Sequence, residues 1–249
     1  EGIFDLEKPD AIFGMHVTNA PHEYVIFKPG PMMASAEAFR ITIQGRQTHG
    51  SRPWEGVDPI TAAFDIGSSL QTIVSRRLNI LDSQAVISVG IVKAGTRNNI
   101  IPDQAMLEGT IRTFEKSYLD KIHTEIETIS TNIAEAHNAT ADVNFAIYGS
   151  YPVTVNDENL AQALMPSMRR ASNDKFYLMK SPRTGAEDFS YFAQEVPGLY
   201  FFIGVNPQNQ EQPYTNHSPL FYIDDDALDV GVKTFINLIE DFSKQYNSN

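Results

Sequence analysis

The chain has 249 residues, with 31 acidic and 19 basic side chains and a formal charge of −12. Surfaces that bind nucleic acid or anionic lipid are normally basic, so neither is an expected partner. No apolar run approaches the ~20 residues that a membrane-spanning helix needs. The absence of Cys excludes disulfides, zinc fingers, iron–sulfur clusters and cysteine nucleophiles.

The chain starts at Glu1-Gly2-Ile3, without Met or a signal peptide, and reaches a strand-like run at 11–15 almost at once. We therefore expect a piece of a longer protein that was cut or trimmed inside a domain. A targeting segment could have been lost with the missing part, so the compartment stays open between cytoplasmic and secreted or periplasmic.

The middle of the chain predicts the order strand, helix, strand, strand, helix, strand. Asp58-Pro59 is typical of a helix start, with Asp as N-cap and Pro in the first turn. The expected strands are 38–44, 86–92, 105–113 and 143–147. The second expected helix spans 115–137. The first begins at Asp58, and its apolar stripe consists of Ile60, Ala63, Phe64, Gly67, Leu70 and Val74. This order is that of the ferredoxin-like βαββαβ motif, placed at 35–148.

The flanking segments predict an α/β layer architecture. Residues 1–34 hold one strand and a Pro-rich loop. Residues 149–249 hold helices at 157–172 and 188–194, a Gly-rich loop at 183–187, a buried strand at 199–205, a polar loop at 206–219 and a last helix from Asp224, with Ala227, Val230, Leu238, Ile239 and Phe242 as its apolar side. The simplest topology is one α/β domain, 1–34 and 149–249, interrupted by the inserted domain 35–148.

Two histidines follow predicted strands. His16 ends the run 11–15, and His217 lies in the polar loop after the buried strand. Sites in open α/β sheets form at the carboxyl ends of strands, so either imidazole suits a metal ligand, and His16 also suits a general base. A capped strand end is the structural alternative for His16. His22 is expected to lie on the loop surface.

The remaining polar candidates are less specific. His49 lies in Gly45–Pro53, where it could stabilise an oxyanion, bind a carboxylate or be a turn residue. Asn99 and Arg112 offer an amide and a guanidinium for a carboxylate. Glu187 lies next to Asp188, which could simply cap the following helix.

No phosphate loop, dinucleotide fingerprint, G-x-S-x-G elbow or His-Glu-x-x-His helix is present. These absences argue against nucleotide enzymes, serine hydrolases and helix-based zinc proteases.

Seven segments in order resemble one family. They are Gly14-Met15-His16-Val17, Gly45–Pro53, Asp58-Pro59-Ile60, Asn99–Asp103, Gly109–Phe114, Gly185–Phe189 and Asn216–Pro219. Together they are similar to the dinuclear-metal aminoacylase and carboxypeptidase family of metallopeptidases, in its hippurate hydrolase and auxin–amino-acid conjugate hydrolase branch. The resemblance covers about residues 10–240.

The resemblance implies a partial catalytic α/β domain of phosphorylase/hydrolase-like fold with an inserted lid that dimerises. It implies cleavage of the amide bond of N-acyl amino acids or small peptides by a metal-activated water, with two divalent ions (Zn, Mn, Ni or Co). His16 and His217 would each ligate a metal, and His49 would steady the oxyanion in the partner subunit. Asn99 and Arg112 would hold the substrate's carboxylate side, and Glu187 would be structural.

The sequence departs from the family in one respect. A Cys-x-His pair and a Glu-Glu pair, the latter with the general base, are expected upstream of the matched region and are not in this chain. We therefore expect the full-length protein to be a hydrolase and this chain alone to be inactive and metal-poor. Two alternatives stay open: a non-catalytic binding or dimerisation module that retains the lid, and a dipeptidase or carboxypeptidase of the same fold.

Overall fold

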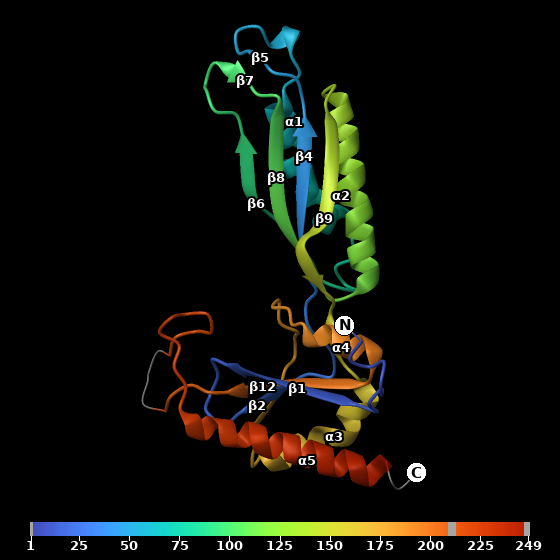
Figure 1. Ribbon diagram of the computed structural model, residues 1–249, viewed down its shortest axis with the longest axis vertical. Coiled ribbons are helices and arrows are strands. Elements are labelled where there is room, and N and C mark those ends of the chain that lie inside the picture. Colours follow the sequence, from blue (N-terminus) through green and yellow to red (C-terminus); the bar gives the residue numbers. More distant parts are fainter. Residues whose placement is uncertain (1, 209–212, 247–249) are drawn as a thin grey trace. The chain divides into compact units, whose positions relative to one another are not determined.

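The computed structural model describes residues 2–208 and 213–246, which form a mixed α/β structure with several sheets (Figure 1). The chain divides into two compact units. Unit 1 comprises Glu1–Met33, Thr154–Arg183 and Glu187–Asn249, and unit 2 comprises Ala34–Val153 and Thr184–Ala186. Within the described part, no helix has the length and apolar character to cross a membrane.

Unit 1 is built on a four-stranded sheet with the order β1-β12-β2-β11. The strands are β1 (Ile12–Thr18), β12 (Gly198–Gly204), β2 (Val25–Phe27) and β11 (Phe176–Leu178). β12 runs parallel to β1 and antiparallel to β2, and every residue of it is buried. Two further short strands, β3 (Gly30–Met33) and β10 (Thr154–Asn156), pair with each other.

Helices cover both faces of this sheet (Figure 1). α3 (Glu158–Ala171) and α5 (Leu228–Tyr246), which follows the 3-10 turn η3 (Asp225–Ala227), pack together on one side. The short helix α4 (Phe189–Glu195) lies on the other side. A Cβ on Gly14 would lie 2.6 Å from the ring of Phe189, so only glycine lets α4 approach β1 this closely.

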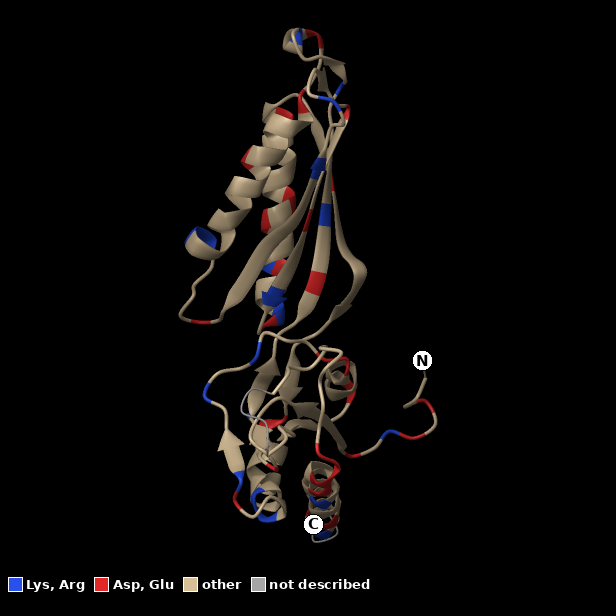
Figure 2. Cartoon of the chain, turned by 90° about the vertical axis from the view of Figure 1, so that its left-hand side faces the viewer, with Lys and Arg blue, Asp and Glu red and all other residues tan. Residues whose placement is uncertain are grey.

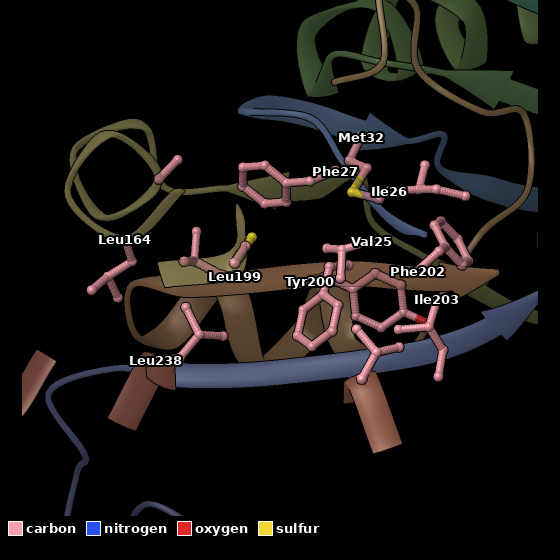
Figure 3. Packing of buried hydrophobic residues seen from close by; sticks show 14 of the residues in the cluster. Val25, Ile26, Phe27, Met32, Leu164, Leu199, Tyr200, Phe202, Ile203 and Leu238 are labelled. Carbon is pink, nitrogen blue, oxygen red and sulfur yellow. The ribbon is translucent and has the colours of Figure 1, made fainter. Parts of the chain in front are cut away.

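The core of unit 1 fills the space between β2, β12 and the helices (Figure 3). Leu199 and Phe201 on β12 are fully buried, and Leu164 of α3 and Leu238 of α5 close the core from one side. Asn156 is also fully buried, and its side chain bonds the backbone of Tyr200 through both amide atoms, which ties β10 to β12.

Unit 2 has an antiparallel sheet with the order β6-β8-β4-β9. The strands are β4 (Ala36–Gln44), β6 (Ala85–Ala94), β8 (Gln104–Thr113) and β9 (Thr140–Tyr151). α1 (Pro59–Thr72), continued by the π-turn η2 (Ile73–Arg77), and α2 (Lys116–Ala136) cover one face. The other face is open, and charged residues of both signs lie along its strands (Figure 2).

A small second sheet ends the loops of unit 2. It consists of β5 (Thr48–His49) and β7 (Ile100–Ile101), with the 3-10 turn η1 (Pro53–Glu55) beside it. Figure 1 shows this sheet beyond one end of β4 and β8. We refer to it as the tip of unit 2.

Most long elements agree with the sequence analysis. Asp58 caps α1 by accepting a hydrogen bond from the backbone N–H of Ile60 at 2.8 Å. Two predicted core residues are wrong: the side chain of Phe64 is 63% exposed and that of Ile239 is 54% exposed. Both fall just off the buried side of an amphipathic helix. Ala62 and Ile66 join the predicted Ala63 and Leu70 on the buried side of α1, and Val230 and Leu238 are buried on α5.

Candidate active site

His16 lies near the carboxyl end of β1, with its side chain exposed. Its register partner on β12 is Phe202, whose ring centroid is 6.1 Å from that of the imidazole. Nδ1 lies 2.5 Å from the carbonyl oxygen of Val17, and since a carbonyl only accepts, Nδ1 carries the proton. The neutral ring therefore presents the Nε2 lone pair, which is the arrangement usual for a metal-ligating histidine.

The loop that carries His217 is tied to the same end of β1. Asn216 donates from Nδ2 to the carbonyl oxygen of Val17 at 3.0 Å and accepts from the backbone N–H of Asn19 at 3.2 Å. The Asn19 side chain in turn donates to the carbonyl oxygens of Pro213 and Tyr214. These hydrogen bonds therefore hold the segment that precedes His217 against the segment that follows His16.

These two imidazoles suit a divalent ion, but they do not complete a dinuclear centre. Each ion needs three or four donors. Among the described residues, no group of three or more potential ligands includes His16 or His217. The described residues therefore supply too few donors for two metal ions at this position.

Glu187 lies just before α4 and is half-buried. It accepts a hydrogen bond from the hydroxyl of Tyr200 at 2.5 Å and from the N–H of Asp188 at 3.1 Å. Burial, with Glu187 beside the hydroxyl, raises the pKa of Tyr200 above its usual range, so the phenol stays protonated and donates. The pair fixes α4 against β12. Asp188 makes no side-chain cap bond to α4.

Arg183 is a site residue that the sequence analysis did not single out. Its guanidinium lies 4.2 Å from the ring centroid of Phe202, the ring that also neighbours His16, and donates to the Thr18 hydroxyl at 2.9 Å. No carboxylate pairs with it among the described residues. Partial burial lowers its pKa from the usual value, but an arginine remains charged. A cation is thus held without a counter-ion on the sheet face that carries His16.

The tip of unit 2 brings His49 and Asn99 together. His49 pairs with Ile100, and the backbone N–H of Gly50 donates to the carbonyl oxygen of Asn99 at 2.8 Å. A Cβ on Gly50 would lie 3.1 Å from that carbonyl group, so a larger residue there would crowd the pairing of β5 with β7.

The contacts of His49 define its tautomer. Nδ1 accepts from the backbone N–H of Ser51 at 3.1 Å and lies 2.8 Å from its hydroxyl. Because a backbone N–H only donates, the proton of the neutral ring is on Nε2. This nitrogen is exposed at the tip and can donate a hydrogen bond to an anionic oxygen.

Arg112 is not part of the tip. It lies near the opposite end of β8, eight residue steps from Gln104, which is about 27 Å along an antiparallel strand. Its guanidinium donates to the Thr110 hydroxyl at 2.9 Å and lines a depression on the open sheet face with Glu108, Tyr148 and other residues. Burial lowers the pKa of Arg112. The structure therefore separates Arg112 from Asn99.

The expectation for His22 is wrong. Its side chain is only 10% exposed, because the loop after β1 turns it inward toward the start of α5. Its Nε2 faces the carboxylate of Asp226.

Comparison with known proteins gives the family. Residues 1–241 match the sequence profile of the Peptidase family M20/M25/M40. "Thermostable carboxypeptidase 2" of Saccharolobus solfataricus is 34% identical over 95% of this chain and 59% of that protein. "IAA-amino acid hydrolase ILR1-like 4" of Arabidopsis thaliana is 34% identical over 91% of this chain and 52% of that protein.

A solved structure agrees with these matches. The YXEP protein of Bacillus subtilis, described as a dinuclear metal binding peptidase from the M20 family, superposes with a TM-score of 0.71 at 31% identity. The match covers 94% of this chain and 57% of that one. The chain belongs to the Peptidase family M20/M25/M40, and the resemblance inferred from the seven motifs is confirmed. It spans about half to three fifths of the length of the relatives it matches.

Proposed function

We propose that the full-length protein is a metal-dependent amidohydrolase that cleaves the amide bond of N-acyl amino acids or small peptides. The observation that carries the proposal is the end of β1, where the tautomer of His16 leaves Nε2 free to ligate and Asn216 attaches the His217 loop. Family membership supports the same reading, since relatives include a carboxypeptidase and an IAA-amino acid hydrolase.

The proposed cofactor is a pair of divalent ions: Zn, Mn, Ni or Co. Imidazole nitrogen suits Zn and Ni in particular. His16 and His217 would each supply one donor, and the remaining donors would come from outside the described residues. This chain alone is therefore expected to be inactive and to hold little metal at these two positions.

The chain's own residues have distinct proposed roles. His49 would donate from Nε2–H to the oxyanion that develops on the attacked carbonyl oxygen. Asn99, beside it at the tip, would hold the carboxylate side of the substrate. Arg112 lies about 27 Å along β8 from Gln104, so it would not contact the same small substrate as Asn99 of its own subunit. Glu187 would be structural through its bond to Tyr200. Arg183, which pairs with no carboxylate of the described residues, would offer a further contact for a substrate anion.

Unit 2 is proposed to be the inserted ferredoxin-like lid and to form a homodimer. Its edge strand β6 exposes Val86, Ile91 and Val92. An unpaired strand edge with apolar side chains is suited to pairing with a second strand. In such a dimer, His49 of one subunit would serve the site of its partner.

A peptidase is the second candidate, because a relative at 34% identity is named a carboxypeptidase. A non-catalytic binding module that retains the lid is the third. A panel of N-acyl amino acids and dipeptides, assayed with the full-length protein and each of the four metals, separates them. We expect metal-dependent turnover that is fastest on an N-acyl amino acid. Preference for dipeptides would favour the peptidase. If the protein turned over no substrate with any of the four metals, both the amidohydrolase and the peptidase proposals would be wrong, and the binding module would be favoured.

A further inference from the structure

His22 is a nearly buried imidazole that forms no hydrogen bond with any residue in the described part of the chain. It lies in the loop between β1 and β2, with its side chain 10% exposed. Its Nδ1 is fully buried and has no hydrogen-bond partner within residues 2–208 and 213–246. Its Nε2 lies 3.5 Å from Oδ1 of Asp226, which is too long for a hydrogen bond of normal strength.

Two carboxylates surround the exposed side of this ring. Asp224 and Asp226 lie at the start of the last helix, where acidic residues are commonly stabilised by the helix dipole. Asp224, the N-cap of this turn, makes no side-chain cap bond, and its Oδ2 accepts a hydrogen bond from the backbone N–H of Gln208 at 3.3 Å. One ligand atom each from His22, Asp224 and Asp226 lies within 4.8 Å of the other two. The acidic pair therefore converges on a buried imidazole.

A divalent cation would fit the donor atoms of this cluster. If Nδ1 holds the proton, the Nε2 lone pair faces the oxygens of Asp226, and a cation between them removes the repulsion. An ion would lie about 2.0–2.2 Å from each donor atom. The three donor atoms already lie within 4.8 Å of one another, so a small inward shift of the side chains would complete these distances.

We propose that His22, Asp224 and Asp226 bind one divalent ion of the first transition row, such as Zn²⁺. One imidazole nitrogen with two carboxylate oxygens suits such ions, whereas Ca²⁺ and Mg²⁺ prefer oxygen alone. None of the three residues is in the set that the family resemblance assigns to metal. The ion joins the β1–β2 loop to the start of α5 and stabilises unit 1.

Metal binding by the purified 249-residue chain tests the proposal. The chain carrying His16→Gln and His217→Gln is stripped of metal and titrated with Zn²⁺, with calorimetry and elemental analysis of the dialysed protein as readouts. We expect one equivalent of Zn²⁺ and a rise in the thermal unfolding midpoint. Adding either His22→Gln or Asp226→Asn abolishes both, while circular dichroism confirms that the fold is kept.

His137→Gln is the matched control, because His137 also faces a carboxylate, that of Asp65, but in unit 2. With this substitution added, the chain should still bind one equivalent of Zn²⁺. If the His16→Gln, His217→Gln chain binds no Zn²⁺, the proposed site is wrong. The site is also wrong if this chain still binds one equivalent of Zn²⁺ after Asp226→Asn is added and the protein remains folded. Neither result depends on hydrolytic activity, so the proposal can fail while the proposed function stands.

Discussion

The side chain of Asn216 donates a hydrogen bond to the carbonyl oxygen of Val17 at 3.0 Å. The two residues are next to His217 and His16, so this bond links the two candidate ligands although 200 positions separate them in sequence. The His16 ring makes its own contact with the same carbonyl oxygen through Nδ1. One backbone oxygen thus orients an imidazole and anchors the loop that carries the other.

Removing this link should weaken metal binding by the full-length protein. Asn216→Ala leaves both imidazoles but frees the His217 loop. Loss of a residue that orients a ligand typically costs about 10–100-fold in metal affinity, and we expect a loss of that size in a competition titration with a chelating dye. Asn144→Ala, on the sheet of unit 2, is the control. An unchanged affinity in Asn216→Ala would mean that the link does not position His217.

His49→Ala in the full-length protein should lower kcat and leave the metal content unchanged. An oxyanion donor is typically worth about 10²–10³ in kcat, and His49 has its Nε2 proton available because Ser51 occupies Nδ1. Steady-state kinetics and elemental analysis give the two readouts. His137→Ala in the same unit should have little effect on kcat. A change under about twofold in His49→Ala would argue against the oxyanion role.

A charge on the β6 edge should weaken the homodimer. Val92→Glu places a carboxylate among exposed apolar side chains of the unpaired edge strand, where it would be desolvated on pairing. Sedimentation velocity over a concentration series measures the shift toward monomer. Phe64→Glu, at an equally exposed apolar position on α1, is the control and should not dissociate the dimer. If Val92→Glu and Phe64→Glu shifted the protein toward monomer to the same extent, the dimer interface would not be at the edge of β6.

Asp241 should make unit 1 sensitive to acid. Hydrogen bonds from Ser167 and Arg170 lower the pKa of this carboxyl from 3.8 to about 2 and join α5 to α3. Because the folded-state pKa lies below the unfolded one, the stabilisation is present above about pH 4 and is lost as the pH falls toward 2. Asp241→Asn should therefore be less stable than the wild type at pH 7.

Urea unfolding at several pH values measures this difference. The difference in the free energy of unfolding between wild type and Asp241→Asn should shrink as the pH falls from about 4 toward 2. Asp174→Asn is the control, since Asp174 lies 3.9 Å from Arg169 and is exposed. If this difference in the free energy of unfolding did not change with pH, the charge of Asp241 would not stabilise the fold.

The sequence predicts the long elements well because their signals are local. The Asp58-Pro59 start of α1 and the three- and four-residue spacing of isoleucines in α2 each need only neighbouring residues. The strands β2, β3, β10 and β11 escaped prediction. They have three or four residues each, and their partners are far away in sequence, as in the pairing of β11 with β2.

The candidate site divides in the same way. His16, with its motif and strand-end position, could be singled out from sequence, whereas Arg183 could not. Its significance arises from contacts with Thr18 and Phe202, which no local pattern encodes. The burial of His22 depends likewise on the start of α5, some 200 residues later. Residues that gain their role from tertiary contacts leave little trace in a single sequence.

The decisive measurement is the metal content and hydrolytic activity of His16→Gln and His217→Gln, each in the full-length protein with an N-acyl amino acid as substrate. We expect that each variant folds, loses bound metal relative to wild type and loses turnover. A folded variant of either kind that retained both its metal and its turnover would contradict the proposed function.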